Sequence, residues 1–204
     1  MSAPAKKLTQ AQHTRGPRRS RKRRTVPVVR TPQEYSRRLV SGAQLIVIDA
    51  HPDLWFDLGC IPRGVAVKLI GQSCGGITGG GAVAVAGRCF LQVSNEARVT
   101  AYEYAHVEAF DTSTVDARGK SQIVGTDHSR IRAEDSAIVF AHCQCHVHAF
   151  GESIIAATDT ATVRLDGDAH VRASAGVCVT GPAAPTNLII EPHPISRLAG
   201  HLNL

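Results

Sequence analysis

An eight-residue repeat runs through residues 65–183 and constrains the fold of this chain more than any other feature. Written from Val65 in blocks of eight, the third position is Val, Ile or Leu in fourteen of fifteen blocks. The first and fifth positions are mostly Ala, Ser, Val or Gly, and the seventh is Gly, Asp or Asn in eleven of the fifteen. Repeats of fixed length are typical of solenoids, in which each unit stacks on its neighbours.

The order of residues within one block predicts a short strand followed by a corner. Side chains alternate along a strand, so the first, third and fifth positions point inward and the second, fourth and sixth point to solvent. The seventh position must turn the chain, and Gly, Asn and Asp tolerate the positive φ that a tight turn requires. We therefore predict an all-β fold, a β-solenoid of eight-residue repeats.

Either two or three repeats can close one coil of such a solenoid. Small inward residues favour two, because Ala and Val cannot fill a wide three-sided interior at native packing density. Fifteen repeats in 16-residue coils would stack to roughly 35 Å. We predict two repeats per coil, with a three-sided coil of 24 residues as the alternative.

The two-sided coil also separates outward side chains by chemistry, whereas dividing the repeats by three scatters them. One face would carry mostly charged and polar residues, Arg98, Thr100, Asp116, Arg118, Arg130, Arg132, Glu134, His146, His148, Arg164 and Asp166. The other would carry Phe90, Phe110, Val124, Ile138, Phe140, Ile154 and Ala156. An exposed apolar strip is typical of a protein-binding surface. The residues predicted to contact a protein partner, or a second copy of this chain, are Phe110, Val124, Ile138, Phe140 and Ile154.

Residues 31–64 precede the repeat and predict a small α/β cap on its first coil. Residues 31–34 (Thr-Pro-Gln-Glu) are typical of a helix start, with Pro at the first helical position and a capping box. The apolar face of this helix would consist of Tyr35, Leu39 and Val40. The helix would end at Gly42, and residues 45–48 predict a strand buried on both faces. Solenoids need such caps because a bare end coil is an unpaired sheet edge.

The repeat ends after Val179, where Pro182, Pro185, Pro192 and Pro194 would interrupt a hydrogen-bonded ladder. We predict that residues 184–204 form a C-terminal cap or tail. Its apolar residues would fold over the last coil, and these are Leu188, Ile189 and Ile190.

The basic residues are concentrated at the N-terminus. Residues 1–38 contain twelve Lys or Arg and one acid, Glu34, which leaves eleven basic and sixteen acidic residues in the remainder. Residues 1–30 have no apolar periodicity and predict a disordered arm. Such an arm favours sequence-independent contact with DNA or another polyanion, and the absence of aromatic residues before Tyr35 argues against base stacking. The predicted phosphate contacts are Lys6, Lys7, Arg15, Arg18, Arg19, Arg21, Lys22, Arg23 and Arg24.

A cluster of histidines and cysteines is the clearest candidate for metal binding. Three His and two Cys fall within seven residues, and together they could supply a tetrahedral zinc site. The candidate ligands are His142, Cys143, Cys145, His146 and His148. The repeat register points these side chains in different directions, so we predict no bound metal.

The sequence contains no clear catalytic set. The least explained polar group near Trp55 consists of Asp49, His51, Asp53 and Asp57, and an enzyme with a site there remains an alternative. The Gly-rich stretch at residues 75–81 lacks Gly-Lys-Ser/Thr and a following helix, so it favours irregular or tightly turned coils over a phosphate loop. We predict a non-enzymatic protein without a cofactor.

The chain has no segment typical of export or membrane insertion. Its uninterrupted apolar runs, such as Leu45 to Ile48, are far shorter than a spanning helix. The charged N-terminus is followed by no apolar stretch of the kind found in secretory signals. Six scattered cysteines are compatible with a reducing compartment. We expect a cytoplasmic protein with no membrane contact.

The repeats AHVEAFDT, SRIRAEDS and ATVRLDGD share the form small-x-Val-x-Ala-x-Asp/Gly-x. In this form the chain resembles octapeptide-repeat proteins of bacterial phages and actinobacterial mobile elements. It also resembles the spread proteins of Streptomyces-type conjugative plasmids. The resemblance covers residues 65–183 and implies a role in plasmid or phage biology with DNA contact. It carries no catalytic residues onto this chain.

These observations lead to one main functional hypothesis and one alternative. The main hypothesis is a non-enzymatic solenoid scaffold that contacts DNA through its basic arm and a protein partner through its apolar face. The alternative is a structural or assembly protein of a phage or filament without a nucleic-acid role.

Overall fold

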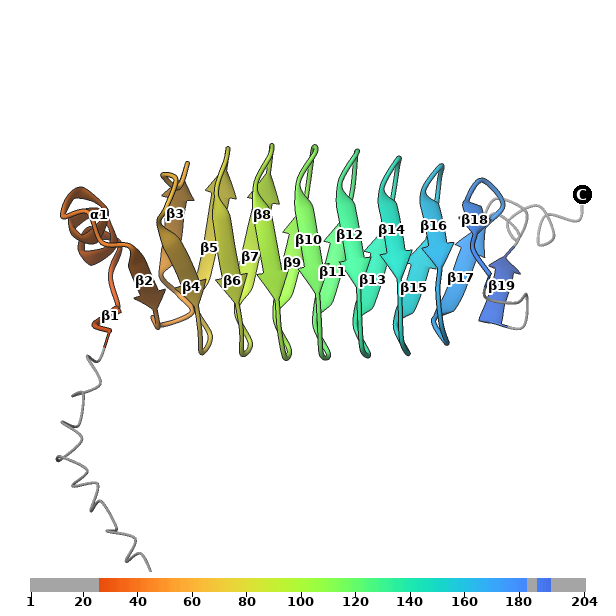
Figure 1. Cartoon of the computed structure of the whole chain (residues 1–204), viewed down its shortest axis with the longest axis horizontal. Coiled ribbons are helices and arrows are strands. Elements are labelled where there is room, and N and C mark those ends of the chain that lie inside the picture. Colours follow the sequence, from red (N-terminus) through yellow and green to blue (C-terminus); the bar gives the residue numbers. More distant parts are fainter. Residues whose placement is uncertain (1–25, 183–186, 192–204) are drawn as a thin grey trace, which may run out of the picture.

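The computed structural model describes residues 26–182 and 187–191 and shows a two-sided parallel β-solenoid of about ten turns (Figure 1). Its strands alternate between two sheets, so that consecutive strands lie on opposite sides of each coil. The predicted fold class is therefore confirmed. The predicted arm, at residues 1–30, lies almost wholly outside the described residues.

Sheet A contains ten strands and sheet B nine. In spatial order sheet A consists of β1 (Val28–Val29), β2 (Leu45–Ile48), β4 (Ala66–Leu69), β6 (Ala82–Val85), β8 (Arg98–Ala101), β10 (Thr114–Ala117), β12 (Arg130–Ala133), β14 (His146–Ala149), β16 (Thr162–Leu165) and β18 (Cys178–Thr180). Sheet B consists of β3 (Trp55–Gly59), β5 (Cys74–Thr78), β7 (Phe90–Ser94), β9 (His106–Ala109), β11 (Gln122–Gly125), β13 (Ile138–Ala141), β15 (Ile154–Ala157), β17 (His170–Ser174) and β19 (Leu188–Glu191).

The register between neighbouring strands fixes the coil at sixteen residues. From β4 to β18 in sheet A and from β5 to β17 in sheet B, each paired residue lies opposite the one sixteen positions later, as Thr114 lies opposite Arg130. Two repeats per coil are thus confirmed, and the alternative with three is wrong. Residues at one repeat position consequently form straight columns along the solenoid.

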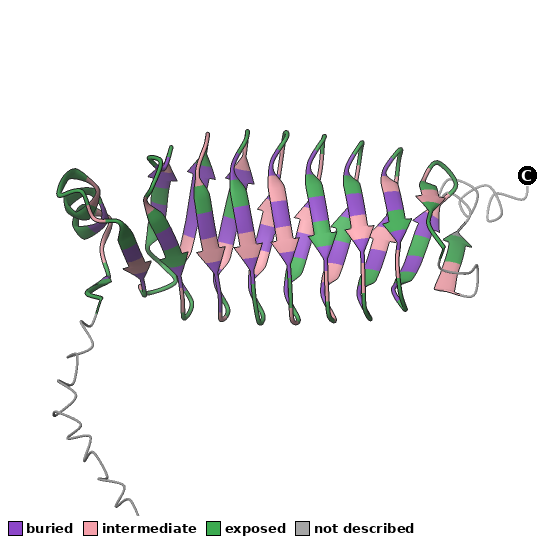
Figure 2. Ribbon diagram, viewed as in Figure 1, coloured by how far each residue is buried: buried purple, intermediate pink, exposed green. Residues whose placement is uncertain are grey.

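The interior is thin and is built from the first, third and fifth repeat positions (Figure 2). In β10, for example, Val115 and Ala117 are fully buried, whereas Thr114 and Asp116, which alternate with them along the strand, are partly exposed. Alternation with period two therefore sorts nearly every strand residue into core or surface. The stacked Val and Ile columns supply most of the apolar area removed from water.

The seventh repeat position turns every corner with a left-handed backbone. Thirteen consecutive seventh positions, from Gly71 to Gly167, have positive φ. Six of them are glycine, five are Asn or Asp, and the exceptions are Glu103 and Cys143. Side chains other than Gly, Asn and Asp adopt this conformation at a cost of about 1–2 kcal/mol, which explains the composition of the column.

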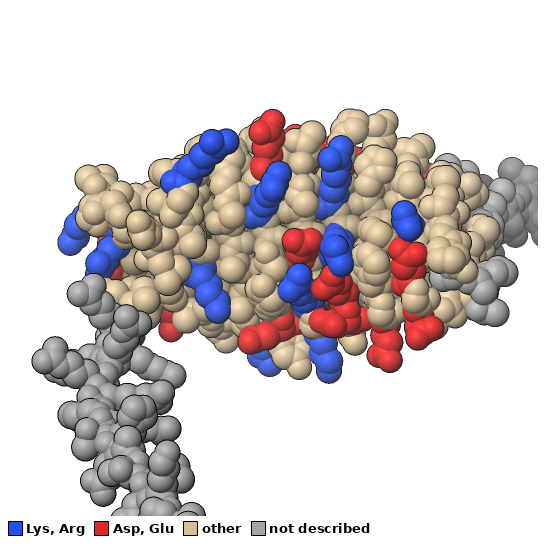
Figure 3. Space-filling view, in the orientation of Figure 1, with Lys and Arg blue, Asp and Glu red and all other residues tan. Residues whose placement is uncertain are grey.

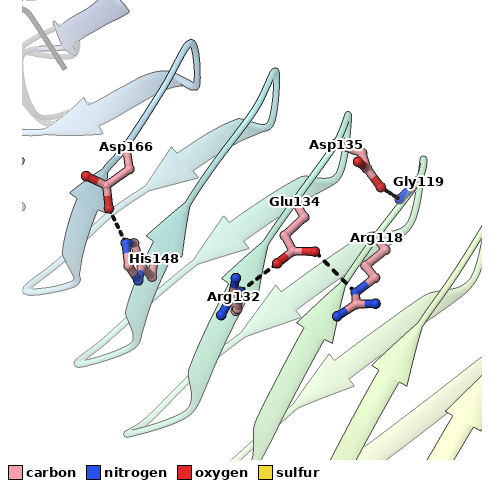
Figure 4. Close-up of polar contacts among 7 residues, drawn as sticks. All are labelled: Arg118, Gly119, Arg132, Glu134, Asp135, His148 and Asp166. Carbon is pink, nitrogen blue, oxygen red and sulfur yellow. Dashed lines mark hydrogen bonds and ion pairs between the residues drawn. The ribbon is translucent and has the colours of Figure 1, made fainter.

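Aspartate at the corner has a second role that the repeat pattern alone did not reveal. The Asp111 carboxylate accepts the N–H of Asn95, the seventh residue of the preceding coil, at 3.1 Å. Asp135 does the same for Gly119, at 3.0 Å (Figure 4). These bonds satisfy backbone donors that the tight corner leaves without a strand partner. The carboxylates thereby connect neighbouring coils.

Gly75, the single exception in the third-position column, makes room for a larger neighbour. It lies opposite Phe56 of β3, whose side chain is fully buried. A Cβ at residue 75 would lie 2.7 Å from the Phe56 carbonyl oxygen. The Gly-rich stretch forms strand β5 up to Thr78 and then turns at Gly79 and Gly81, which have positive φ. The tight turn that was one of the two expectations for this stretch is therefore present, and the pairing of β3 with β5 contains a register shift.

Residues 31–64 form the predicted helix, but their strands extend the two sheets of the solenoid and do not form a separate cap. The helix α1 (Pro32–Val40) is present, and the Thr31 hydroxyl accepts the N–H of Glu34 at 3.3 Å. β2 and β3, however, belong to the two sheets as their continuation. Leu45 is exposed while Ile46 and Ile48 are buried, so this strand is covered on one face only.

The helix α1 is anchored by one buried side chain. Tyr35 packs into the core, and its hydroxyl donates to the carbonyl of Leu58 at 3.1 Å. Burial, with the nearby carboxylate of Asp57, raises the pKa of Tyr35 to about 12. Val40, expected on the same apolar face, is instead 90% exposed.

The C-terminal end is an open pair of edge strands among the described residues. We expected residues 188–190 to fold over the last coil, but they belong to β19, which pairs in parallel with β17 and extends sheet B. Ile189 and Ile190 are more than half exposed there.

We predict that Glu103→Asn raises the free energy of unfolding by about 1 kcal/mol, because Asn tolerates positive φ better than Glu. Chemical denaturation monitored by circular dichroism measures the change. The control is Glu152→Asn at the exposed eighth position, where φ is not positive and the effect should stay within about 0.5 kcal/mol. Equal effects of the two substitutions would contradict the corner argument.

Candidate functional site

The N-terminal end of the solenoid is basic where the described chain begins. Arg30, Arg37 and Arg38 are all exposed, the last two in the final turn of α1. The one acid here, Glu34, accepts the backbone N–H of Arg30 at 2.7 Å. Arg37 and Arg38 also complement the helix dipole, and their exposed charges remain available to an anion.

The predicted phosphate contacts, Lys6 to Arg24, lie outside the described residues. The chain reaches the solenoid at Val26, beside β1 at the end where α1 lies (Figure 1). Arg30, Arg37 and Arg38 therefore extend the basic segment onto a folded surface. These three residues were not among the predicted phosphate contacts, although they continue the basic segment in the sequence.

The outer face of sheet A carries ion pairs that bridge neighbouring coils. Glu134 pairs with Arg132 at 2.7 Å and with Arg118 of the preceding coil at 3.2 Å (Figure 4). Blue and red side chains are interleaved over the middle of the solenoid in Figure 3. Since exposed pairs contribute at most about 1 kcal/mol each, they set the charge pattern of this face more than its stability.

A second group on sheet A joins His148 and Arg164 to Asp166. The His148 ring bonds the Asp166 carboxylate, and Arg164 lies 3.3 Å from it. The bond from His148, with the positive charge of Arg164, lowers the pKa of Asp166. The aromatic ring of Phe150 lies tilted against the ring of His148, and its centroid is 4.8 Å from the guanidinium carbon of Arg132. The acid charges of this region are thus largely neutralised by their neighbours.

Arg98 and Arg130 differ from the other arginines of sheet A, because no acidic partner lies within 4.0 Å among the residues that the structure describes. Both occupy the second-position column and line an open groove with Thr114. The floor of the groove consists of small side chains, Ala66, Ala82 and Ala84. Asp116 also lines this groove, so its surface carries both positive and negative charge.

The outer face of sheet B carries the predicted apolar strip. Phe140 is 42% exposed and Ile154 51% exposed, and Ile138 and Val124 are partly exposed beside them. These residues occupy the second and fourth positions of β11, β13 and β15, so they form one continuous patch. Phe110 lies at the corner after β9, at the margin of the patch, and Ile189 of β19 adds an exposed side chain that the sequence analysis placed elsewhere.

Aromatic rings continue this face toward the N-terminal end. Trp55 lies 6.1 Å from Phe90, and Phe90 stacks on His106 at 5.4 Å. Beside them the Gln92 amide donates to Glu108 at 3.0 Å. The row lies on β3, β7 and β9 and separates the apolar strip from α1.

The candidate metal ligands are divided between the two faces and the core. His146 and His148 point outward from sheet A, whereas His142 lies after β13 on sheet B and contacts Thr158 at 2.8 Å. Cys145 is fully buried, which raises the pKa of its thiol to about 11. No group of three or more potential ligands occurs in the described part of the chain.

The polar residues near Trp55 make local contacts and do not converge. His51 lies 3.3 Å from Asp53 in an exposed turn, and Asp57 accepts the N–H of Gly59 at 3.0 Å. Asp49 lies beside Gly71, in the next coil. This arrangement aligns no nucleophile with a base.

Within the described ranges, none of the helical structure is long and apolar enough to cross a membrane. Comparison of the chain with protein-family models, with curated proteins and with solved structures finds no match. The geometry of the described residues and the charge of the sequence therefore carry the functional argument.

We predict that a brief pulse of a maleimide at pH 8 labels Cys143 in the folded protein and spares Cys145. Cys143 is exposed at a corner, whereas Cys145 is buried with a raised pKa, and the reacting species is the thiolate. Peptide mass spectrometry measures both sites, with unfolded protein as the control in which both react. Equal labelling of the two in the folded protein would contradict the register.

Proposed function

We propose that this chain is a non-enzymatic scaffold that binds DNA through its basic N-terminal segment and presents the rigid solenoid to a protein partner. The proposal joins two parts with different physical roles. The arm supplies electrostatic attraction, and the solenoid supplies a flat surface of fixed geometry.

The observation that carries the proposal is the concentration of positive charge at one end. Residues 1–38 hold twelve of the twenty-three basic residues with a single acid. Arg30, Arg37 and Arg38 continue that charge onto the exposed surface of the described end. Each Lys or Arg that neutralises a phosphate releases a condensed counterion, so binding of this kind is strong, independent of sequence and dependent on salt.

The two sheets of the solenoid support a scaffold role. The two sheets are continuous ladders of hydrogen-bonded strands, and acids such as Asp111, Asp135 and Glu134 are used in corner bonds or in ion pairs. Sheet B adds the apolar strip around Phe140, which is suited to a protein contact. The resemblance of the repeats to octapeptide-repeat proteins of phages and mobile elements supports a role in plasmid transfer or phage biology.

We predict that replacing six arm residues with glutamine weakens DNA binding and lowers its salt dependence. The substitutions are Arg18→Gln, Arg19→Gln, Arg21→Gln, Lys22→Gln, Arg23→Gln and Arg24→Gln. The slope of log affinity against log salt should fall by up to about 5, since each phosphate contact contributes about 0.9. Fluorescence anisotropy with a labelled duplex measures both quantities.

The matched control neutralises Arg98 and Arg130, which lie on β8 and β12 in the middle of sheet A. This variant should keep most of the salt slope. If the arm variant binds as tightly as the unaltered chain, the proposal is wrong.

A second candidate is a structural or assembly protein with no nucleic-acid role. The exposed edge at β18 and β19, with Ile189 and Ile190, favours it, because an open edge is a template for another strand. End-to-end polymers in electron micrographs, together with no DNA affinity at low salt, would favour this candidate over the scaffold.

A further inference from the structure

One column of sheet A consists entirely of side chains that can donate hydrogen bonds. It occupies the second repeat position from β8 to β16, where the pairing of the strands holds each residue opposite the one sixteen positions later. We term it the donor row, and its members are Arg98, Thr114, Arg130, His146 and Thr162. Arg98, Arg130 and His146 are exposed, and the two threonines are partly exposed.

The donor row has no partner within the folded chain. In the part of the chain that the structure describes, none of its five side chains makes a hydrogen bond or an ion pair. The neighbouring fourth and sixth positions differ, because Arg132 pairs with Glu134 and His148 bonds Asp166 (Figure 4). The donors of the row are therefore available to a ligand without breaking a contact of the fold.

The repeat itself does not require donors at this position. In the same coils, the second position of sheet B carries Phe90, His106, Gln122, Ile138 and Ile154, most of which are apolar or stacked. Both sheets have the same strand geometry and the same buried columns of Val, Ile and Ala. The chemistry of the donor row therefore reflects what the outer face of sheet A contacts.

The donor row follows an open depression in the surface. Two hollows adjoin along it and share Thr114 and Arg130. Ala82 and Ala84 line the part nearest α1, so a large ligand can approach the sheet closely there. At about 4.8 Å between strands, the row is roughly 19 Å long. This shape fits an extended ligand better than a small molecule.

We propose that the donor row binds the phosphates of one strand of a DNA duplex that the arm also contacts. The inference deepens the proposed function by adding a second part to the DNA-binding surface, and it rests on that function for the identity of the polyanion. Arginine side chains and threonine hydroxyls are common donors to phosphate oxygens. Because each strand of DNA advances about 3.4 Å per phosphate, a row of this length faces about six phosphates.

The balance of charge on sheet A favours a polyanion. The second and fourth positions from β4 to β16 include five basic residues and one acid, Asp116. The same positions of sheet B, from β5 to β17, include one of each, Arg172 and Glu108. Asp116 lines the hollow beside Arg98 and Arg130, so its charge opposes a phosphate there. The five basic residues are Lys68, Arg98, Arg130, Arg132 and Arg164.

The side chains of this face are suited to the DNA backbone and not to the bases. No Phe, Tyr or Trp occupies a second or fourth position among the described strands of sheet A, so the face has no platform on which a base could stack. A flat sheet also contacts the outside of a duplex and does not enter its grooves. Binding along the donor row should therefore be independent of sequence.

The arm and the donor row belong to the same side of the molecule. The chain reaches the solenoid at β1, the first strand of sheet A, and the row begins at β8, four strands further along. This distance is roughly 19 Å, whereas the twenty-five residues before Val26 can span about 80 Å when extended. One duplex lying along sheet A can contact both. Sheet B then faces away from the DNA, with its apolar strip open to a protein partner.

Neutralising the two arginines of the row tests the proposal in the full chain. Arg98→Gln combined with Arg130→Gln should lower the slope of log affinity against log salt by about 2, because each phosphate contact contributes about 0.9. The loss should be the same in the arm variant with six glutamines. It is small beside the effect of the arm, so most of the slope remains, as stated for this pair above. Anisotropy with a labelled duplex measures the slope.

One added carboxylate on each sheet provides a matched comparison. Thr114→Glu on β10 and Gln122→Glu on β11 change the same repeat position by the same charge. Thr114→Glu should lower the salt slope by about 1, and Gln122→Glu should leave it unchanged. Asp116→Asn should strengthen binding by about twofold or more, because it removes the acid beside the row. Circular dichroism confirms that each variant is folded.

Two results would overturn the inference. They are an unchanged slope in the variant that lacks Arg98 and Arg130, and equal effects of Thr114→Glu and Gln122→Glu. The same measurements keep the arm and the row apart. If only the arm variant loses binding, the donor row is wrong and the arm stands. If only the sheet A variants lose binding, the arm proposal is wrong and the row stands.

Discussion

The rest of the structure depends on the corner at every eighth residue. A left-handed seventh residue ends each strand after the same number of positions, so that every strand begins in register with the one sixteen residues earlier. Where the residue is Asp, its carboxylate also holds the N–H of the preceding corner. Constant coil length then produces straight columns. These columns make the thin Val and Ala core possible and keep charged and apolar surface apart.

The sequence predicted the fold and the two faces well, because both follow directly from the period. Small inward residues, together with the segregation of charge, were sufficient to choose two repeats per coil over three. The bonds made by corner aspartates were not predicted, because Asp and Gly are equivalent in a pattern that records only turn propensity. The pairing of Gly75 with Phe56 was missed for a related reason, since it joins segments outside one repeat.

Both ends of the solenoid were less predictable than its middle. β2 pairs with β4 at an offset of 21 residues, so a search for a period of eight does not find it. β19 pairs with β17 at an offset of 17, after a segment rich in proline. The repeat register correctly predicted where the candidate metal ligands lie, with Cys145 in the core and His146 on the surface. The charges of Arg37 and Arg38 were counted with the basic N-terminal segment, and the structure adds that both residues are exposed in the final turn of α1.

The functional proposal depends on the same columns as the fold. If the coil did not contain sixteen residues, Val124, Phe140 and Ile154 would not share one face. Double electron–electron resonance, with spin labels at Thr100 and Arg164 in a chain whose native cysteines are replaced, tests this directly. Both residues occupy fourth positions on sheet A, four coils apart, so their backbones should lie roughly 19 Å apart. The pair at Thr100 and Arg172, on opposite sheets, should give a longer distance. A shorter distance for the second pair, as a 24-residue coil requires, would contradict the account.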